Sequence, residues 1–405
     1  MAITFLETEI SELCLGKPAI KAAVTTVTTV KEALTLLKKA GDSYVSVWRG
    51  REKEEGVGVG GVACVGRFCV ADVICFLCRE ENFGRPLEAL EEPVSCLLVE
   101  DSRNIVKHLE INSSVLEAID CILEGTQNLV IPMHDYTKFK SGRKFLNAPS
   151  LSGFSLHSSS EYCWLTQEDI VRFLLNSIGV FSPLPTYTIK SLNVITRDIM
   201  TIHYNDPASL ALSCIQRAIT EQASVAVIDD NRRLIGEISP NSLAYLDETV
   251  AAAIMTLSAG DLMAYTDYGG PPEDLVQLVK MRLEDKGLTT MLQLVDELTV
   301  SSISSSSSFS SCSSDDDAFS GLSGRNSISS GHYSSVIRSE AIMCFPWSSL
   351  IAVMVQALAH RVSHVWVVDK EQTLVGLVTF QSILEVLRGV VDGQSKQCEE
   401  NSFKQ

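Results

Sequence analysis

The sequence predicts a mixed α/β fold made of four similar units. The clearest unit spans residues 346–388, where apolar residues at helical spacing lead into two short β-rich runs and then a second helix. The two β-rich runs, residues 364–368 and 374–378, are separated by a polar turn. One such unit has a small two-stranded sheet and too little core to be stable alone, so we expect it to pack against copies of itself.

The same order of helix, strand, strand and helix occurs three more times along the chain. We expect the first helices over residues 30–37, 115–122 and 210–218, and the first strands over residues 44–48, 128–133 and 224–229. The second strands are expected over residues 62–69, 162–166 and 234–239, and the second helices over residues 70–77, 167–175 and 240–246. One order of elements found four times indicates internal repeats.

The ends of the second strands carry the most specific motif. The second unit reads Leu165-Thr166-Gln167-Glu168-Asp169-Ile170, and the first contains GRFCVAD, which includes Gly66 and Cys69. These endings and the four units resemble the cystathionine-β-synthase (CBS) domain, and the layout is similar to plant CBS-domain proteins of the CBSX type and, more distantly, to the gamma regulatory subunit of AMP-activated kinase. The resemblance covers nearly the whole chain apart from loops, a Ser-rich tract and the tail. It implies two Bateman modules, each a pair of repeats, in a pseudo-symmetric disc.

The domain boundaries follow from this pairing. We expect residues 1–182 to form the first module with repeats one and two, and residues 194–393 to form the second with repeats three and four. Residues 183–193 are predicted to be a linker, because prolines break the helical pattern there. The Ser-rich tract 301–335 has few apolar groups to offset the entropy of ordering, so we expect a disordered insertion. Residues 394–405 are predicted to be a flexible tail.

Composition narrows the class of protein. The chain has 33 basic and 50 acidic residues, a net charge of −17, which argues against nucleic acid and membrane surfaces as partners. No apolar run approaches a membrane span, and the N-terminus carries three glutamates before its first lysine, unlike a signal or transit peptide. The 12 cysteines fall mostly at predicted core positions, which is typical of reduced thiols. We therefore expect a cytoplasmic or nuclear protein.

A strand that ends in Thr or Ser before x-x-Asp suits a nucleotide. The hydroxyl and the free N–H groups of the following helix favour phosphate, and the carboxylate can accept hydrogen bonds from ribose hydroxyls. The resemblance implies that Asp72 and Asp169 contact the ribose and that Cys69 and Thr166 lie on the phosphate side. The same letters also form helix caps, which any folded repeat needs.

Repeats three and four depart from this pattern, because serine stands where the aspartate would be. Their weaker candidates are Ser239, Ser242, Thr379 and Ser382. A hydrogen bond to a charged partner contributes about 1.5 to 3 kcal/mol, so its loss weakens a site about tenfold to a hundredfold. We therefore predict that binding belongs to the first module.

The predicted function is a non-catalytic regulatory protein. The resemblance implies that it senses AMP, ADP, ATP or S-adenosylmethionine and passes the occupancy of its site to a regulated protein partner, for example a kinase complex. No nucleophile elbow, P-loop or metal-ligand cluster is found, so neither catalysis nor a required cofactor or metal is expected. The alternative is a ligand-free interaction scaffold regulated by phosphorylation of the Ser-rich loop, with Ser313, Ser314 and Ser327 as candidate sites. Homodimer formation stays open.

Overall fold

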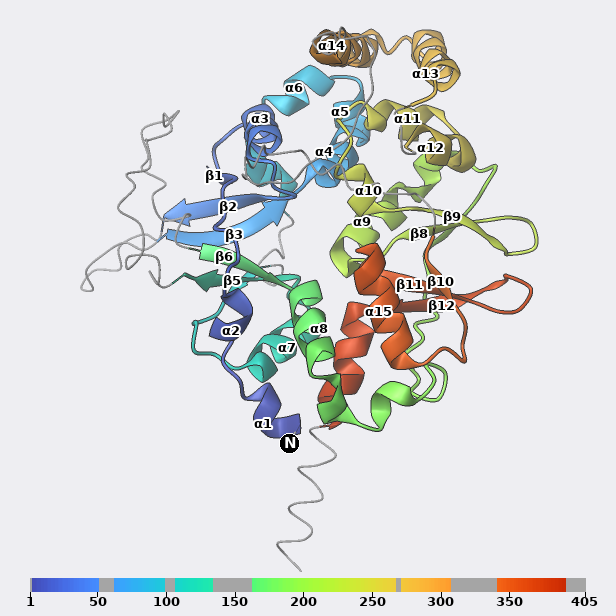
Figure 1. The fold of residues 1–405 in the computed structure, drawn as a ribbon. Coiled ribbons are helices and arrows are strands. Elements are labelled where there is room, and N and C mark those ends of the chain that lie inside the picture. Colours follow the sequence, from blue (N-terminus) through green and yellow to red (C-terminus); the bar gives the residue numbers. More distant parts are fainter. Residues whose placement is uncertain are drawn as a thin grey trace, which may run out of the picture.

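Four three-stranded sheets, one in each repeat, organise the computed structural model, which describes residues 2–50, 62–98, 106–133, 162–266, 271–306 and 341–390 (Figure 1). The strands are β1 (Ala23–Thr25), β2 (Val45–Gly50) and β3 (Val62–Phe68); β4 (Val106–His108), β5 (Asn128–Pro132) and β6 (Tyr162–Thr166); β7 (Thr201–His203), β8 (Val225–Ile228) and β9 (Leu234–Ile238); and β10 (Met343–Cys344), β11 (His364–Val368) and β12 (Leu374–Thr379). The mixed α/β fold with four repeats is confirmed.

Each sheet has one strand more than we predicted. A strand of only two or three residues precedes the first helix of every repeat and pairs in parallel with the middle strand, as β1 does with β2. The middle and last strands then form the antiparallel pair that the sequence predicts. The prediction of a two-stranded sheet was wrong because strands this short carry no readable alternation of apolar and polar residues.

The helices begin and end at local signals. The first long helix, α3, begins at a capping box made by Thr29 and Glu32 and ends at Gly41, whose φ of 67° is the left-handed conformation that glycine adopts readily. The α-helices are α1 (Ala2–Leu6), α2 (Ser11–Cys14), α3 (Val30–Ala40), α4 (Val70–Leu77), α5 (Glu80–Phe83), α6 (Pro86–Leu90), α7 (Val115–Leu123), α8 (Gln167–Asn176), α9 (Leu212–Glu221), α10 (Pro240–Leu243), α11 (Val250–Thr256), α12 (Ala259–Tyr265), α13 (Glu273–Asp285), α14 (Thr289–Ser306), α15 (Leu350–His360) and a helix over 380–390. Short 3-10 helices cover Val94–Leu97, Ile178–Phe181, Leu184–Thr186 and Ala208–Ala211.

The sheets pair within each module. In the first module β3 contacts β4, and a small cluster that includes Trp48 and Val130 fills the space between the two sheets. In the second module Arg233 and Thr373 form an antiparallel bridge between the hairpins of repeats three and four. Repeats one and two therefore form one unit and repeats three and four another, as the resemblance implied.

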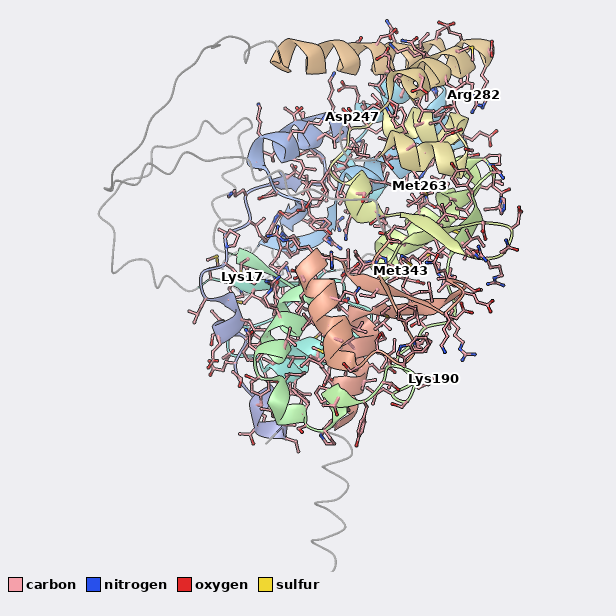
Figure 2. All side chains as sticks on the ribbon, turned by 45° about the vertical axis from the view of Figure 1, so that its right-hand side comes forward. Lys17, Lys190, Asp247, Met263, Arg282 and Met343 are labelled. Carbon is pink, nitrogen blue, oxygen red and sulfur yellow. The ribbon has the colours of Figure 1, made fainter. Side chains whose placement is uncertain are left out.

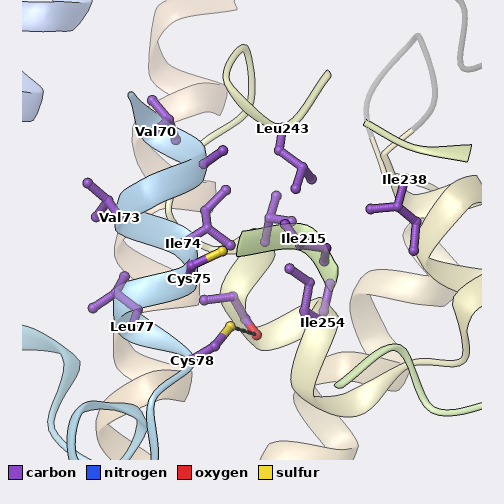
Figure 3. Close-up of a cluster of buried hydrophobic side chains, with 14 of the residues drawn as sticks. Val70, Val73, Ile74, Cys75, Leu77, Cys78, Ile215, Ile238, Leu243 and Ile254 are labelled. Carbon is purple, nitrogen blue, oxygen red and sulfur yellow. Dashed lines mark hydrogen bonds between the residues drawn. The ribbon is translucent and has the colours of Figure 1, made fainter. Parts of the chain in front are cut away.

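The helices join the two modules across the middle of the disc. One large core combines repeats one and three, and a second combines repeats two and four. In the first core α4 packs against α9, α10 and α11, and Figure 3 shows Ile74 of α4 facing Ile215 and Ile254 of repeat three. In the second core α8 packs against α15. Figure 1 shows the result, with the sheets of the two modules on opposite sides and the helices between them.

Two segments differ from the predicted domain plan. Residues 183–193 are not a free linker: Ile189 is buried, and its N–H donates to the carbonyl of Ser348 in repeat four. The helix α14 extends to Ser306, so residues 301–306 of the predicted disordered insertion are helical, and α14 also contacts α6 of repeat one. The rest of that tract lies outside the described residues, as do the predicted phosphorylation sites and the tail.

Within the described ranges, none of the helices has the length and apolar character needed to cross a bilayer.

Candidate functional site

A cavity of about 1480 Å³ lies where the four repeats meet. All four contribute to its walls: β3 and α4 of repeat one, the start of β5 and of α8 from repeat two, α9 and α10 of repeat three, and the end of α15 from repeat four. Small-molecule sites usually measure about 300 to 1,000 Å³, so this space is large enough for a nucleotide. We regard it as the candidate site.

All four strand-to-helix turns reach this cavity, the one of repeat four through Phe380. Cys69 and Asp72 reach it from the β3–α4 turn, Thr166 from the β6–α8 turn, and Ser239 and Ser242 from the β9–α10 turn. The structure therefore brings together five of the eight residues that the sequence singled out.

The other three predicted residues, Asp169, Thr379 and Ser382, are not among the residues that line the cavity. Repeat four contributes Phe380 and the residues around Arg361 instead.

Asp72 acts as a cap on α4. Its Oδ2 accepts a hydrogen bond from the N–H of Cys69 at 2.8 Å, which is the N-cap arrangement that the sequence left as an alternative. Burial raises the pKa of the Asp72 carboxyl above its ordinary value, because a charged carboxylate loses hydration there. Burial likewise raises the pKa of the Cys69 thiol, so this group stays protonated at neutral pH and is a weak hydrogen-bond donor.

The side chain of Asp169 makes more polar contacts than that of Asp72. Its Oδ2 accepts from the N–H of Thr166 at 2.8 Å and from the Thr166 hydroxyl at 2.6 Å, and the Lys17 ammonium lies 2.5 Å from the same oxygen. A carboxylate bound in this way stabilises the start of α8 and attaches the N-terminal segment to it. Contact between Asp169 and a ribose stays a prediction.

The later repeats use their hydroxyls differently. In repeat four Thr379 and Ser382 cap each other, because the N–H of each donates to the other's side-chain oxygen. Ser239 precedes α10, yet its side chain makes no capping hydrogen bond, and the residue lines the cavity. Its hydroxyl can therefore turn toward a ligand.

Four arginines line the cavity, and the sequence reasoning missed all of them: Arg67, Arg79, Arg172 and Arg361. Arg172 pairs with Glu168 on its own helix. Within the part of the chain that the structure describes, the other three form no ion pair with a carboxylate. A chain with a net charge of −17 thus places at this cavity three guanidinium groups that have no carboxylate partner among the described residues.

Arg67 is the most constrained of the four. Its guanidinium stacks on the Tyr44 ring, 3.9 Å from the centroid, and its Nη2 donates to Gln127 Oε1 at 3.0 Å. With the Asn128 amide oriented so that its oxygen faces Arg67, that oxygen accepts from Nε at 2.5 Å and from Nη2 at 2.9 Å. The available sequence signal was an arginine in an otherwise apolar strand, two residues before the turn.

A chain of hydrogen bonds links all four repeats around this point. Beyond Arg67, Gln127 Nε2 donates to the carbonyl of Thr220 at 2.6 Å, and Gln222 Nε2 donates to the carbonyl of Gln127 at 3.0 Å. The hydroxyl of Ser363 then donates to the carbonyl of Gln222 at 2.6 Å. The walls of the cavity are therefore coupled to one another through polar contacts.

Comparison with known proteins places the chain in a family. The CBS-domain family profile matches residues 335–389. Among curated proteins, the Arabidopsis thaliana CBS domain-containing protein CBSX5 is 43% identical over 96% of this chain and 98% of its own length. The Arabidopsis CBSX6 is 27% identical over 95% and 94%, and the SNF1-related protein kinase regulatory subunit gamma-like PV42b is 20% identical over 81% and 76%.

A solved structure shows the same fold. A Methanocaldococcus jannaschii protein, described as a proposed archaeal homologue of g-AMPK, superimposes with a TM-score of 0.51 at 15% identity, over 93% of this chain and 99% of that one. The four repeats, their pairing and the identity to CBSX5 over nearly the full length of both chains lead to one conclusion. The chain belongs to the CBS domain-containing proteins.

Proposed function

We propose that this protein is a non-catalytic regulator that binds an adenosine nucleotide or a related adenosyl ligand in its central cavity. The observation that supports this most is the set of arginines without carboxylate partners among the described residues: Arg67, Arg79 and Arg361. A guanidinium suits phosphate oxygens because it donates two parallel hydrogen bonds and keeps its charge.

The rest of the cavity fits the other parts of such a ligand. Among the aromatic rings that line it, Tyr245 is 65% exposed and can offer an apolar face for a base. The hydroxyls of Ser239 and Ser242 can donate to a phosphate or a sugar, and the carboxylate of Asp72 can accept from sugar hydroxyls. AMP, ADP, ATP and S-adenosylmethionine combine these groups in different proportions, and all four belong in the test.

The output of such a regulator is a change in how the repeats sit relative to one another. A phosphate that binds Arg67 competes with Gln127 and Asn128 for the same donors. Gln127 is in turn bound to repeat three, and repeat three to Ser363 of repeat four. A ligand with different affinities for two arrangements of these contacts shifts the balance between them, and a partner can recognise the difference.

The partner class that we propose is a protein kinase complex. One relative with 20% identity bears the name of a regulatory gamma-like subunit of an SNF1-related kinase, and the fold matches that of a proposed archaeal g-AMPK homologue. Association of two copies of this chain through their modules is a further proposal.

Isothermal titration calorimetry of the full chain with AMP, ADP, ATP and S-adenosylmethionine tests the proposal. We expect micromolar binding of at least one ligand and a weakening of about tenfold to a hundredfold in Arg67→Gln, the amount expected when a charged hydrogen bond is lost. Arg85→Gln is the matched control, because Arg85 pairs with Glu88 on the surface and does not line the cavity. Absence of binding to all four ligands would reject the proposal.

The second candidate is a ligand-free scaffold that holds a partner. It is favoured by the carboxylates of Asp72 and Asp169, which both serve as helix caps. Its regulation would come from phosphorylation in the Ser-rich loop, where Ser313, Ser314 and Ser327 are the candidates. A scaffold of this kind shows no rise in Tm with any of the four ligands, whereas a ligand at 100 times its Kd stabilises a binding protein by about 2.7 kcal/mol.

A further inference from the structure

Arg67 and Glu237 occupy the same position in repeats one and three and carry opposite charges. Each lies on the last strand of its repeat, two residues before the residue that precedes the following helix, which is Cys69 in repeat one and Ser239 in repeat three. Both side chains line the central cavity. A molecule bound there therefore meets a positive group from the first module and a negative group from the second.

The Glu237 carboxylate is held in place by repeat four. Its Oε2 accepts a hydrogen bond from the indole N–H of Trp366 at 2.5 Å, and His364 Nε2 lies 3.0 Å from the same oxygen. Both partners are on β11, which pairs with β10 and its Met343 (Figure 2). The Glu237 side chain is only 10% exposed, so these two contacts fix its position at the wall of the cavity.

The other carboxylate oxygen, Oε1, makes no hydrogen bond within the part of the chain that the structure describes. Among the described residues, the Ser224 hydroxyl is the only buried side-chain polar atom without a hydrogen-bond partner, so Oε1 of Glu237 is not sealed from solvent. Because Glu237 lines the cavity, a bound molecule can reach this oxygen. A carboxylate oxygen accepts hydrogen bonds and repels other anions, so it suits an N–H or O–H group of the ligand and not its phosphate.

We propose that Oε1 of Glu237 accepts a hydrogen bond from the amino group of an adenine base and so selects the base of the ligand in this cavity. The inference rests on the proposed binding of an adenosyl ligand there. Arg67, Arg79 and Arg361 attract the phosphate. Tyr245, on the same repeat as Glu237, can offer its ring to the base. The charges thus orient the ligand, with its phosphate towards the arginines and its amino group towards Glu237.

A ribose is a less suitable donor for this carboxylate. The two neighbouring hydroxyls of a ribose can donate to both oxygens of one free carboxylate. In Glu237, Oε2 already has Trp366 and His364 as neighbours, which leaves one oxygen for the ligand. The amino group of adenine needs only one acceptor. A single free oxygen therefore favours the base over the sugar.

The first test compares AMP with purine riboside 5′-monophosphate, which lacks only the amino group, by isothermal titration calorimetry of the full chain. We expect AMP to bind about tenfold to a hundredfold more tightly, which is the effect of one hydrogen bond to a charged group. Equal affinities would overturn this proposal and leave the proposed function standing. Absence of binding to both nucleotides would reject the two together.

Glu237→Gln tests the residue itself. The Trp366 N–H needs an acceptor, so the glutamine oxygen should take the place of Oε2 and its NH₂ group the place of Oε1. An amide donor at that place cannot accept from the amino group, so we expect the preference for AMP to disappear. The loss of affinity caused by a 2′-deoxy sugar in AMP should be the same in this variant as in the unsubstituted protein.

Glu168→Gln is the matched control. Glu168 lines the same cavity but pairs with Arg172 on its own helix, so this variant should keep the preference for AMP. An unchanged preference in Glu237→Gln, an equal loss in Glu168→Gln, or a change in the 2′-deoxy effect in place of the amino effect would overturn the proposal. The comparison in the unsubstituted chain can still refute it if Glu237→Gln does not fold.

Discussion

The two modules join their repeats by different means. In the first, Trp48 is 1% exposed and packs against the rings of His108 and Tyr162 of repeat two, while its indole N–H donates to the Ser46 hydroxyl on its own strand at 2.8 Å. In the second, Trp366 is fully buried and its indole N–H donates to Glu237 of the neighbouring repeat at 2.5 Å. His364 approaches the same carboxylate oxygen at 3.0 Å.

The first interface thus combines packed rings with a hydrogen bond from the Cys64 N–H to His108, and the second contains a nearly buried carboxylate that needs donors. Removing one partner from a buried charge leaves the charge unsatisfied, which costs far more than removing one contact from an apolar surface. We therefore expect the interface of the second module to be more sensitive to the loss of a side chain than that of the first. Substitutions at matched positions can measure the difference.

The largest effect is expected from truncating the two tryptophans. Trp48→Ala should lower the free energy of unfolding by about 3 to 5 kcal/mol, the usual result for deleting a buried aromatic side chain. Trp366→Ala should lower it by about 1 to 3 kcal/mol more, because Glu237 also loses a donor. Denaturant unfolding of both variants checks this, and equal losses would contradict the contrast between the interfaces.

Replacing each tryptophan with phenylalanine removes the indole hydrogen bond and keeps most of the ring packing. Trp366→Phe should cost about 1.5 to 3 kcal/mol, because the lost bond is to a charged group, whereas Trp48→Phe should cost about 0.5 to 1.5 kcal/mol for a bond between neutral groups. Thermal unfolding at neutral pH measures both. A larger loss in Trp48→Phe than in Trp366→Phe would show that the carboxylate does not matter.

Two strand glycines give a similar but smaller contrast. A Cβ at Gly376 of β12 would lie 2.5 Å from the backbone oxygen of Thr196, which cannot move freely because Thr196 is paired with Leu377. A Cβ at Gly66 of β3 would meet only the end of the flexible Leu98 side chain. Gly376→Ala should cost about 1 to 3 kcal/mol by overpacking, and Gly66→Ala less. Equal midpoints in urea would contradict this.

The smallest effect concerns pH. Burial raises the pKa of Asp72 above its unfolded value of about 3.9, so the folded protein holds this proton more tightly. The stability that Asp72 contributes is therefore complete below the unfolded pKa and is lost as the pH rises through the folded pKa. The stability of Asp72→Asn relative to the unsubstituted protein should increase from acidic to neutral pH in urea titrations. Parallel pH profiles would contradict this.

Much of the fold could be predicted from local sequence. The helix Val70–Leu77 and the strands Tyr162–Thr166 and His364–Val368 have the predicted ends, because apolar periodicity and capping residues act over a few neighbours. The short parallel strands and the sharing of cores between repeats one and three were missed. They depend on partners far away in the chain, which periodicity does not report.

The candidate site could be predicted only in part, because some of its contacts also join residues that are far apart in the chain. The strand-to-helix turns identified Cys69, Asp72 and Thr166, which do line the cavity. Nothing local indicated that Lys17 would bind Asp169, 152 residues away. The convergence of Arg67 and Arg361 from different modules likewise follows only from the packing of the repeats.

We propose that both modules contribute to one site for an anionic adenosyl ligand, in place of the sequence-based prediction that binding belongs to the first module alone. The most direct measurement is the affinity and stoichiometry of ATP binding, by calorimetry, in Arg67→Gln of the first module and Arg361→Gln of the second. We expect each substitution to weaken the same binding event by about tenfold to a hundredfold with unchanged stoichiometry. Weakening by only one of the two, or two independent binding events, would contradict a shared cavity.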